Sequence, residues 1–152
     1  MMQRDADVIC TLRNGRGMRV AVSVRDASLV SWWAPDRYGR MADVLAAPRQ
    51  QSSPAGWLCE ASTDASLSLS LLQDGLAARL RYYLDDDGSL HIEGEATADT
   101  VTRLALPAPW FNLRERGASV ADHALRLAAD RYYPNEVAGC EAREVAGSAF
   151  DF

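Results

Sequence analysis

The chain has 152 residues, of which 48% are apolar and 24% charged, a balance that predicts one folded domain and argues against disorder. All 16 cations are arginines, and with 21 acids they leave a formal charge of −5. These arginines are scattered and build no basic stripe, so we predict no nucleic-acid partner. The absence of lysine excludes a Schiff-base lysine and the lysine of a P-loop.

The start of the chain and its cysteines bear on the compartment. The first seven residues carry acids where a signal peptide carries a basic and then an apolar region, and no apolar run approaches the roughly 20 residues that span a bilayer. Three widely spaced cysteines, Cys10, Cys59 and Cys140, form no CxxC motif that would indicate a zinc site or a redox pair. We therefore expect a cytoplasmic protein with buried, reduced thiols, no membrane contact and no metal.

Apolar residues alternate with polar ones along most of the chain, which is typical of β-strands. The first predicted strands, with glycine-containing turns before and between them, cover residues 18–24, 27–34 and 41–45. An antiparallel meander with turns at 73–75 and 85–88 is predicted over residues 67–71, 76–84, 90–96 and 101–106. Shorter strands are predicted at 131–133 and 144–146, and residues 120–129 fit either a short helix or a strand.

Residues 46–65 interrupt the alternation, because proline, glycine, serine and glutamine dominate there. We predict an irregular connection over this range, with a brief strand at 57–59. The flanking β-rich halves are not clearly self-sufficient, so we predict a single domain over residues 1–152. Its class is all-β, and its architecture an antiparallel β-sandwich.

His91 lies on a predicted strand with Glu93 and Glu95 on the same face. A histidine beside carboxylates can act as a general acid or base, or begin a metal site. The alternative is the solvated face of an antiparallel sheet. Asp122 and His123 are adjacent and point to opposite faces of a strand, so a loop-capping role is favoured over a catalytic pair.

Aromatic residues occur in pairs along the chain, at 32–33, 82–83, 110–111 and 132–133. An exposed tryptophan or tyrosine can stack on the apolar face of a sugar, whereas a strand aromatic facing inward belongs to the core. Composition alone leaves both interpretations open.

Several strings follow one another in a fixed order along nearly the whole chain. They are the run 11–24, Pro35-Asp36-Arg37-Tyr38-Gly39, the hairpin 82–90 with 95–99, Trp110-Phe111-Asn112-Leu113, the segment 122–134 and the last residues 145–152. In this order they resemble the aldose 1-epimerases (galactose mutarotases). The resemblance implies a galactose mutarotase-like β-sandwich, shortened relative to the family.

The same resemblance shows where this sequence departs from the family. Ala108 stands where the family has its catalytic histidine, and residues 46–65 replace the segment that carries a sugar-binding arginine and a second histidine. The family's catalytic glutamate is expected beyond the last residue of this sequence. Mutarotation needs a base on the anomeric hydroxyl and an acid on the ring oxygen. We therefore expect no inherited catalytic residue and no mutarotase catalysis.

These observations lead to one functional prediction and two alternatives. The prediction is a non-catalytic, aldose 1-epimerase-like protein, a carbohydrate-recognition protein or a remnant, that contacts a monosaccharide through Trp110, Asn112 and His91 without a cofactor. The first alternative is an active epimerase with a rebuilt site that uses His91. The second is an interaction module whose unpaired sheet edges favour a homodimer.

Overall fold

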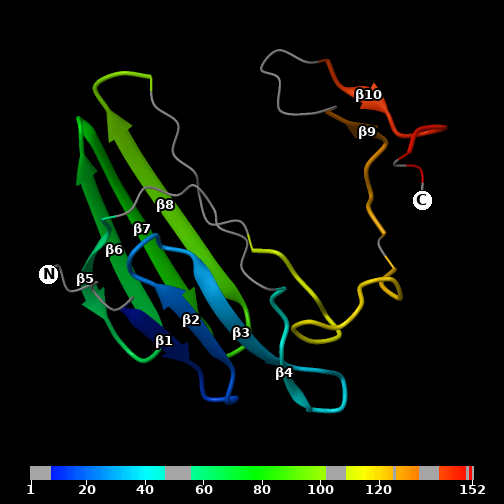
Figure 1. Cartoon of the computed structure of the whole chain (residues 1–152), viewed down its shortest axis with the longest axis horizontal. Helices are drawn as coiled ribbons and strands as arrows, with labels where there is room; N and C mark the ends of the chain where they lie inside the picture. The colour runs from blue at the N-terminus through cyan, green and yellow to red at the C-terminus, as the bar shows by residue number, and fades with distance from the viewer. Residues whose placement is uncertain are drawn as a thin grey trace, which may run out of the picture. The chain divides into compact units, whose positions relative to one another are not determined.

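The computed structural model of the chain describes residues 8–46, 56–101, 109–124, 126–133, 141–149 and 151 (Figure 1). Contacts divide the chain into two compact units, Met1–Val120 and Ala121–Phe152. The described residues form strands, turns and irregular segments, and a helix able to cross a membrane is not among them. The all-β prediction is confirmed, while the interpretation of residues 1–152 as one domain stays a prediction.

The first sheet of the larger unit is antiparallel and has the strand order β1-β2-β3-β4 (Figure 1). Its strands are β1 (Ile9–Arg13), β2 (Arg19–Ser23), β3 (Leu29–Pro35) and β4 (Met41–Asp43). As the alternation predicts, Met18, Val20 and Val22 are buried on one face of β2. Pairing of β2 with β3 shifts register between Ala21 and Val22, close to the turn in which Ala27 takes a positive φ of 57°.

The second sheet is the predicted antiparallel meander, in the order β5-β6-β7-β8. Its strands are β5 (Leu58–Ser62), β6 (Ser66–Gln73), β7 (Leu76–Leu84) and β8 (Leu90–Ala98). Asp74 and Gly75 join β6 to β7, with φ values of 48° and 77°. Two successive positive φ values define the hairpin turn whose twist matches that of the strands it joins.

The core lies between these two sheets. Its largest fully buried side chains are Tyr82, Leu12, Leu67, Leu69, Leu80, Leu84, Val20 and Val22. Two turns from opposite sheets are also bonded directly, because Asn14 Nδ2 donates to the carbonyl of Asp85 at 2.9 Å and the amide of Gly15 donates to Asp86 Oδ1 at 3.0 Å. The sandwich is therefore held by apolar burial inside and by polar turn contacts at one end.

The smaller unit contains one short antiparallel pair, β9 (Arg131–Tyr132) with β10 (Arg143–Glu144). Two further bonds extend it, from the amide of Val145 to the carbonyl of Asp130 at 2.8 Å and from the amide of Gly147 to Asp151 Oδ2 at 2.8 Å. Both short strands were predicted. The described residues of 120–129 form neither the helix nor the strand considered for them.

Three sequence predictions need correction. Within residues 46–65, the brief strand predicted at 57–59 is longer than expected and forms β5 (Leu58–Ser62), while Trp57 is buried; residues 47–55 lie outside the described part. Strand β1 was not predicted at all. The expectation of buried thiols is wrong for Cys59, which is exposed, and Cys10 is only half-buried. Residues 102–106 of the predicted strand 101–106, and Cys140, lie outside the described residues.

Candidate functional site

A hollow of about 570 Å³ opens beside β3, β4 and the segment that follows residue 109. We call it the Trp32 hollow, and its lining consists of Met18, Trp32, Ala34, Pro35, Asp36, Arg40, Ala42, Val44, Gly88, Phe111, Leu113 and Arg114. The rings of Trp32 and Phe111 pack with their centroids 5.7 Å apart at an interplanar angle of 60°. One part of the lining is thus aromatic, while Asp36, Arg40 and Arg114 make another part charged.

Trp32 reaches this hollow because of its position on β3. It pairs with Val20 of β2, which is fully buried, so its indole lies on the inner face of the first sheet. The Nε1 atom of this indole is buried and has no acceptor among the described residues. Buried N–H groups are nearly always bonded to protein, water or ligand, so this donor has capacity for a further acceptor.

Asp43, at the end of β4, fixes the segment that carries Phe111. Its Oδ1 accepts the amide of Trp32 at 3.0 Å, and its Oδ2 accepts Arg116 Nε at 2.8 Å. The guanidinium of Arg116 also donates to the carbonyl of Val30. This carboxylate therefore ties β3 to the segment after residue 109, which carries Phe111.

Asn112, predicted to bind sugar, is buried and holds its own loop together. Its Nδ2 donates to the carbonyl of Ala118 at 2.7 Å, its Oδ1 accepts the amide of Arg114 at 3.2 Å, and its own amide donates to the carbonyl of Val44 at 2.7 Å. Both side-chain heteroatoms are engaged with the backbone. Asn112 thus shapes the wall of the hollow, and a direct contact with sugar stays a prediction.

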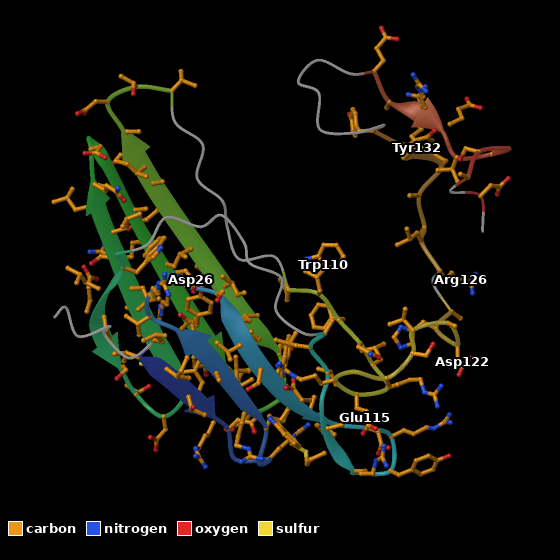
Figure 2. All side chains as sticks on the ribbon, viewed as in Figure 1. Asp26, Trp110, Glu115, Asp122, Arg126 and Tyr132 are labelled. Atoms are coloured by element: carbon orange, nitrogen blue, oxygen red, sulfur yellow. The ribbon has the colours of Figure 1, made fainter. Side chains whose placement is uncertain are left out.

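Trp110 precedes this wall, and its carbonyl accepts the amide of Ala46 at 2.8 Å. Its side chain is exposed and stands out from the chain beside it (Figure 2). Exposure of an indole fits the predicted role in stacking on sugar. Trp110 and Asn112 therefore flank Phe111, the residue that lines the hollow itself.

His91 lies elsewhere, on the outer face of the second sheet. Its Nε2 is 3.0 Å from Asp85 Oδ2, and its ring lies 6.0 Å from that of Tyr83. With Arg81 and Glu93, these two rings line a smaller hollow of about 200 Å³. The structure thus does not bring His91 into one site with Trp110 and Asn112.

The carboxylate nearest to His91 belongs to Asp85 rather than to the predicted Glu93 or Glu95. The His91 hydrogen bond, with help from the amide of Ser89, lowers the pKa of Asp85 below its usual value. Glu95 is bonded instead to Arg79, at 3.1 Å. Asp85 also accepts the amide of Ser89 in the β7–β8 turn, so its bond to His91 stabilises this hairpin. The exposed position of the pair fits the alternative interpretation of His91, the solvated face of an antiparallel sheet.

Comparison with known proteins finds a partial sequence similarity. No profile of a known protein family matches it. It is 33% identical over 81 residues to aldose 1-epimerases of Escherichia coli K12 and Shigella flexneri, a match that covers 51% of this chain. The match covers only 23% of each of those two enzymes.

The fold is compared over a longer stretch. A crystal structure of a GalM/aldose epimerase homologue from C. elegans superposes with a TM-score of 0.78, covering 97% of this chain and 64% of that one at 19% identity. The protein therefore has the galactose mutarotase-like β-sandwich fold. Over 81 residues its sequence is also similar to that of the bacterial aldose 1-epimerases.

Sequence reasoning missed the two residues at the centre of the hollow, Trp32 and Phe111. Both belong to the aromatic pairs singled out along the chain, but the pairing alone does not say which ring faces inward. Pairing with β2 shows which ring faces inward: Trp32 lies opposite the buried Val20, and Trp33 lies opposite Arg19 on the other face. The guanidinium of Arg19 is 5.3 Å from the centre of the Trp33 ring. A strand register would have been needed to find the site.

Proposed function

We propose that this protein recognises a monosaccharide in the Trp32 hollow and does not interconvert its anomers. The observation that carries the proposal is an aromatic pair, Trp32 and Phe111, that lines one hollow together with charged side chains. Pyranoses offer an apolar face to aromatic rings and hydroxyls to polar groups. The kinship with aldose 1-epimerases supports a sugar as the ligand.

The ionisable groups that line the hollow support the proposed absence of catalysis. Among the lining residues that the structure describes, these are Asp36, Arg40 and Arg114. Backbone hydrogen bonds from Arg40 and Tyr38 lower the pKa of Asp36, which makes this carboxylate a weak base. Arginine keeps its proton at neutral pH and so cannot serve as the acid. A base and an acid across one reacting centre are therefore missing from this lining.

Titration with sugars tests the recognition. We expect D-galactose or D-glucose, added at millimolar concentration to the ¹⁵N-labelled chain, to shift the indole N–H resonance of Trp32 and the amides of residues 111–114. The Trp32→Leu and Phe111→Leu variants should lose the response. The Trp33→Leu variant, altered on the opposite face of the same strand, should retain it. An unchanged spectrum across several aldoses would contradict the proposal.

Polarimetry tests the absence of catalysis. Freshly dissolved α-D-glucose should equilibrate at the same rate with and without the protein. Acceleration that disappears in a His91→Ala variant would instead establish the first alternative, an epimerase with a rebuilt site. Acceleration retained in that variant would also contradict our proposal and direct attention to other residues.

A second candidate role, self-association, is favoured by strand β8. Its Ile92 and Gly94 lie opposite Tyr82 and Leu80 in the register and so continue the core-facing surface of the sheet, yet both are exposed. Exposed core-facing residues on the last strand of a described sheet fit pairing with a second copy of this chain. Light scattering should then show a dimer that Ile92→Lys dissociates and Thr97→Lys, on the outer face of the same strand, does not. A strict monomer at high concentration would contradict this role.

A further inference from the structure

Two cysteines lie on the facing sides of the two sheets, at the same edge of the sandwich. Cys10 of β1 pairs with Val22, and Cys59 of β5 pairs with Leu69. Val22 and Leu69 are both fully buried core residues. Since paired residues of neighbouring strands project to the same face, both thiols project toward the space between the sheets. Both β1 and β5 are edge strands of their sheets, as described here.

Backbone hydrogen bonds hold the two sheets together on either side of this cysteine pair. The amide of Arg13, three residues after Cys10, donates to the carbonyl of Asp64 at 2.5 Å. The amide of Gly56, three residues before Cys59, donates to the carbonyl of Arg25 at 3.1 Å. These bonds keep the edges of the two sheets together on the side from which both thiols project.

The exposed thiol influences the titration of the half-buried one. Burial raises the pKa of the Cys10 thiol, and the charge of Cys59 together with a side-chain hydrogen bond to it raises that pKa further. Cys59 is exposed and open to a reagent, whereas Cys10 is half-buried and packs against the core. An accessible thiol beside a protected one is the arrangement in which the first is attacked and the second resolves the intermediate.

We propose that Cys10 and Cys59 form a redox modification site, which closes as an intramolecular disulfide by exchange with a small disulfide of the glutathione type. The Cys59 thiolate attacks one sulfur of the reagent, forms a mixed disulfide and releases one thiolate. The Cys10 thiolate then attacks the Cys59 sulfur and releases the second. Two protein thiols lose their protons and are oxidised, and one reagent disulfide is reduced to two thiols.

The site is independent of sugar recognition, because the lining of the Trp32 hollow contains neither cysteine. Its effect is mechanical: the oxidised form joins β1 to β5 covalently and closes that edge of the sandwich. The reduced form leaves the edge held by backbone hydrogen bonds and apolar contact. The chain therefore has two states of different stability that a thiol–disulfide buffer can interconvert.

The test is peptide mapping after equilibration of the full chain with reduced and oxidised glutathione. Trypsin cleaves after arginine and separates the three cysteines into peptides 5–13, 50–79 and 132–143. We expect a cross-link between the first two peptides, reversed by dithiothreitol. Titratable thiols should fall from three to one per chain, and the thermal midpoint should rise in the oxidised form.

Single variants distinguish this site from general thiol oxidation. Cys10→Ser should accumulate a glutathione adduct on Cys59, because the resolving thiol is gone, and Cys59→Ser should not form the cross-link. Cys140→Ser is the matched control and should form it unchanged. A stable adduct on Cys59 of the native chain, or cross-links that involve Cys140, would overturn the proposal.

Discussion

The two edges of the second sheet, strands β5 and β8, differ in how the first sheet covers them. At the β5 edge, backbone hydrogen bonds from Arg13 and Gly56 join the two sheets, and the thiols of Cys10 and Cys59 project between them. At the β8 edge, the core-facing side chains from Ile92 onward are exposed, although the residues paired with them on β7 are buried. Alternation thus defines a strand and its faces, whereas coverage by the other sheet decides whether a face becomes core.

The largest expected change in the free energy of unfolding concerns the β5 edge. Oxidation to the Cys10–Cys59 disulfide closes a loop of about 50 residues, which removes on the order of 4 kcal/mol of chain entropy from the unfolded state. Denaturation with urea of the oxidised and reduced chain measures the difference, and Cys10→Ser should abolish it. An oxidised form no more stable than the reduced one would contradict this prediction.

The next effect contrasts a covered and an uncovered position on the same face. Leu80→Ala, in the core, should lower the free energy of unfolding by about 3 kcal/mol. Ile92→Ala, with 37% of its surface already exposed, should cost about 1 kcal/mol or less. Both are measured by urea denaturation under reducing conditions. Equal losses would show that the β8 face is covered in solution, as a dimer would cover it.

A third prediction concerns the Tyr82 hydroxyl, which donates to the carbonyl of Ala27 and so links β7 to the first sheet. Tyr82→Phe should lower the free energy of unfolding by about 1 kcal/mol, since one buried acceptor loses its donor. Burial, with a smaller contribution from Asp26, raises the pKa of Tyr82 above its usual value.

The raised pKa gives this prediction a pH dependence. The tyrosine must stay neutral in the folded state, so its contribution is complete below its unfolded pKa near 10 and is lost as pH rises beyond it. The native chain should therefore lose stability above about pH 10 more steeply than Tyr82→Phe. Parallel alkaline unfolding curves for the two chains would contradict this.

The smallest expected change in stability concerns the outer face of the second sheet, where Arg79 links the two edge strands. Its guanidinium bonds Glu60 of β5 and Glu95 of β8, each at 3.1 Å. The Arg79 hydrogen bond lowers the pKa of Glu60. Arg79→Gln should raise that pKa toward its usual value, which a carboxylate NMR titration measures.

The sign of the accompanying stability change follows from the direction of this pKa shift. A lowered folded pKa stabilises the chain at neutral pH, and this contribution is lost as pH falls through that pKa. The native chain should therefore lose slightly more stability than Arg79→Gln on acidification. High salt should reduce the difference, because the ion pairs are exposed.

Much of the fold was accessible from the sequence because alternation and turn chemistry act locally. Leu67, Leu69 and Leu71 alternate with serines in β6, and the Asp74–Gly75 dipeptide fixes the hairpin to β7. β1 escaped prediction because its short segment, with Cys10 and Thr11 between apolar residues, shows no clear period. The buried position of Trp57 escaped for another reason: the prolines and serines before it indicate a surface connection.

The candidate site was less accessible, because it depends on which residues meet across the fold. The motif around Asn112 located the wall of the hollow, but its amide is bonded within the loop. His91 was paired with carboxylates on its own strand, whereas the turn brings Asp85 to it. Local spacing identifies candidate side chains, and only register and turn geometry assign their partners.

The bonded turns at one end of the sandwich have a consequence for the folding rate. Asn14 and Gly15 belong to the first hairpin, and their acceptors lie 71 residues later in the last hairpin of the second sheet. Each hairpin can form early from neighbouring residues, but their docking must close most of the intervening chain. The rate-limiting step of folding should therefore be the docking of two preformed hairpins. If the hydrogen bond from Asn14 to the carbonyl of Asp85 forms in the transition state of that step, Asn14→Ala slows refolding; if it forms later, the variant mainly speeds unfolding.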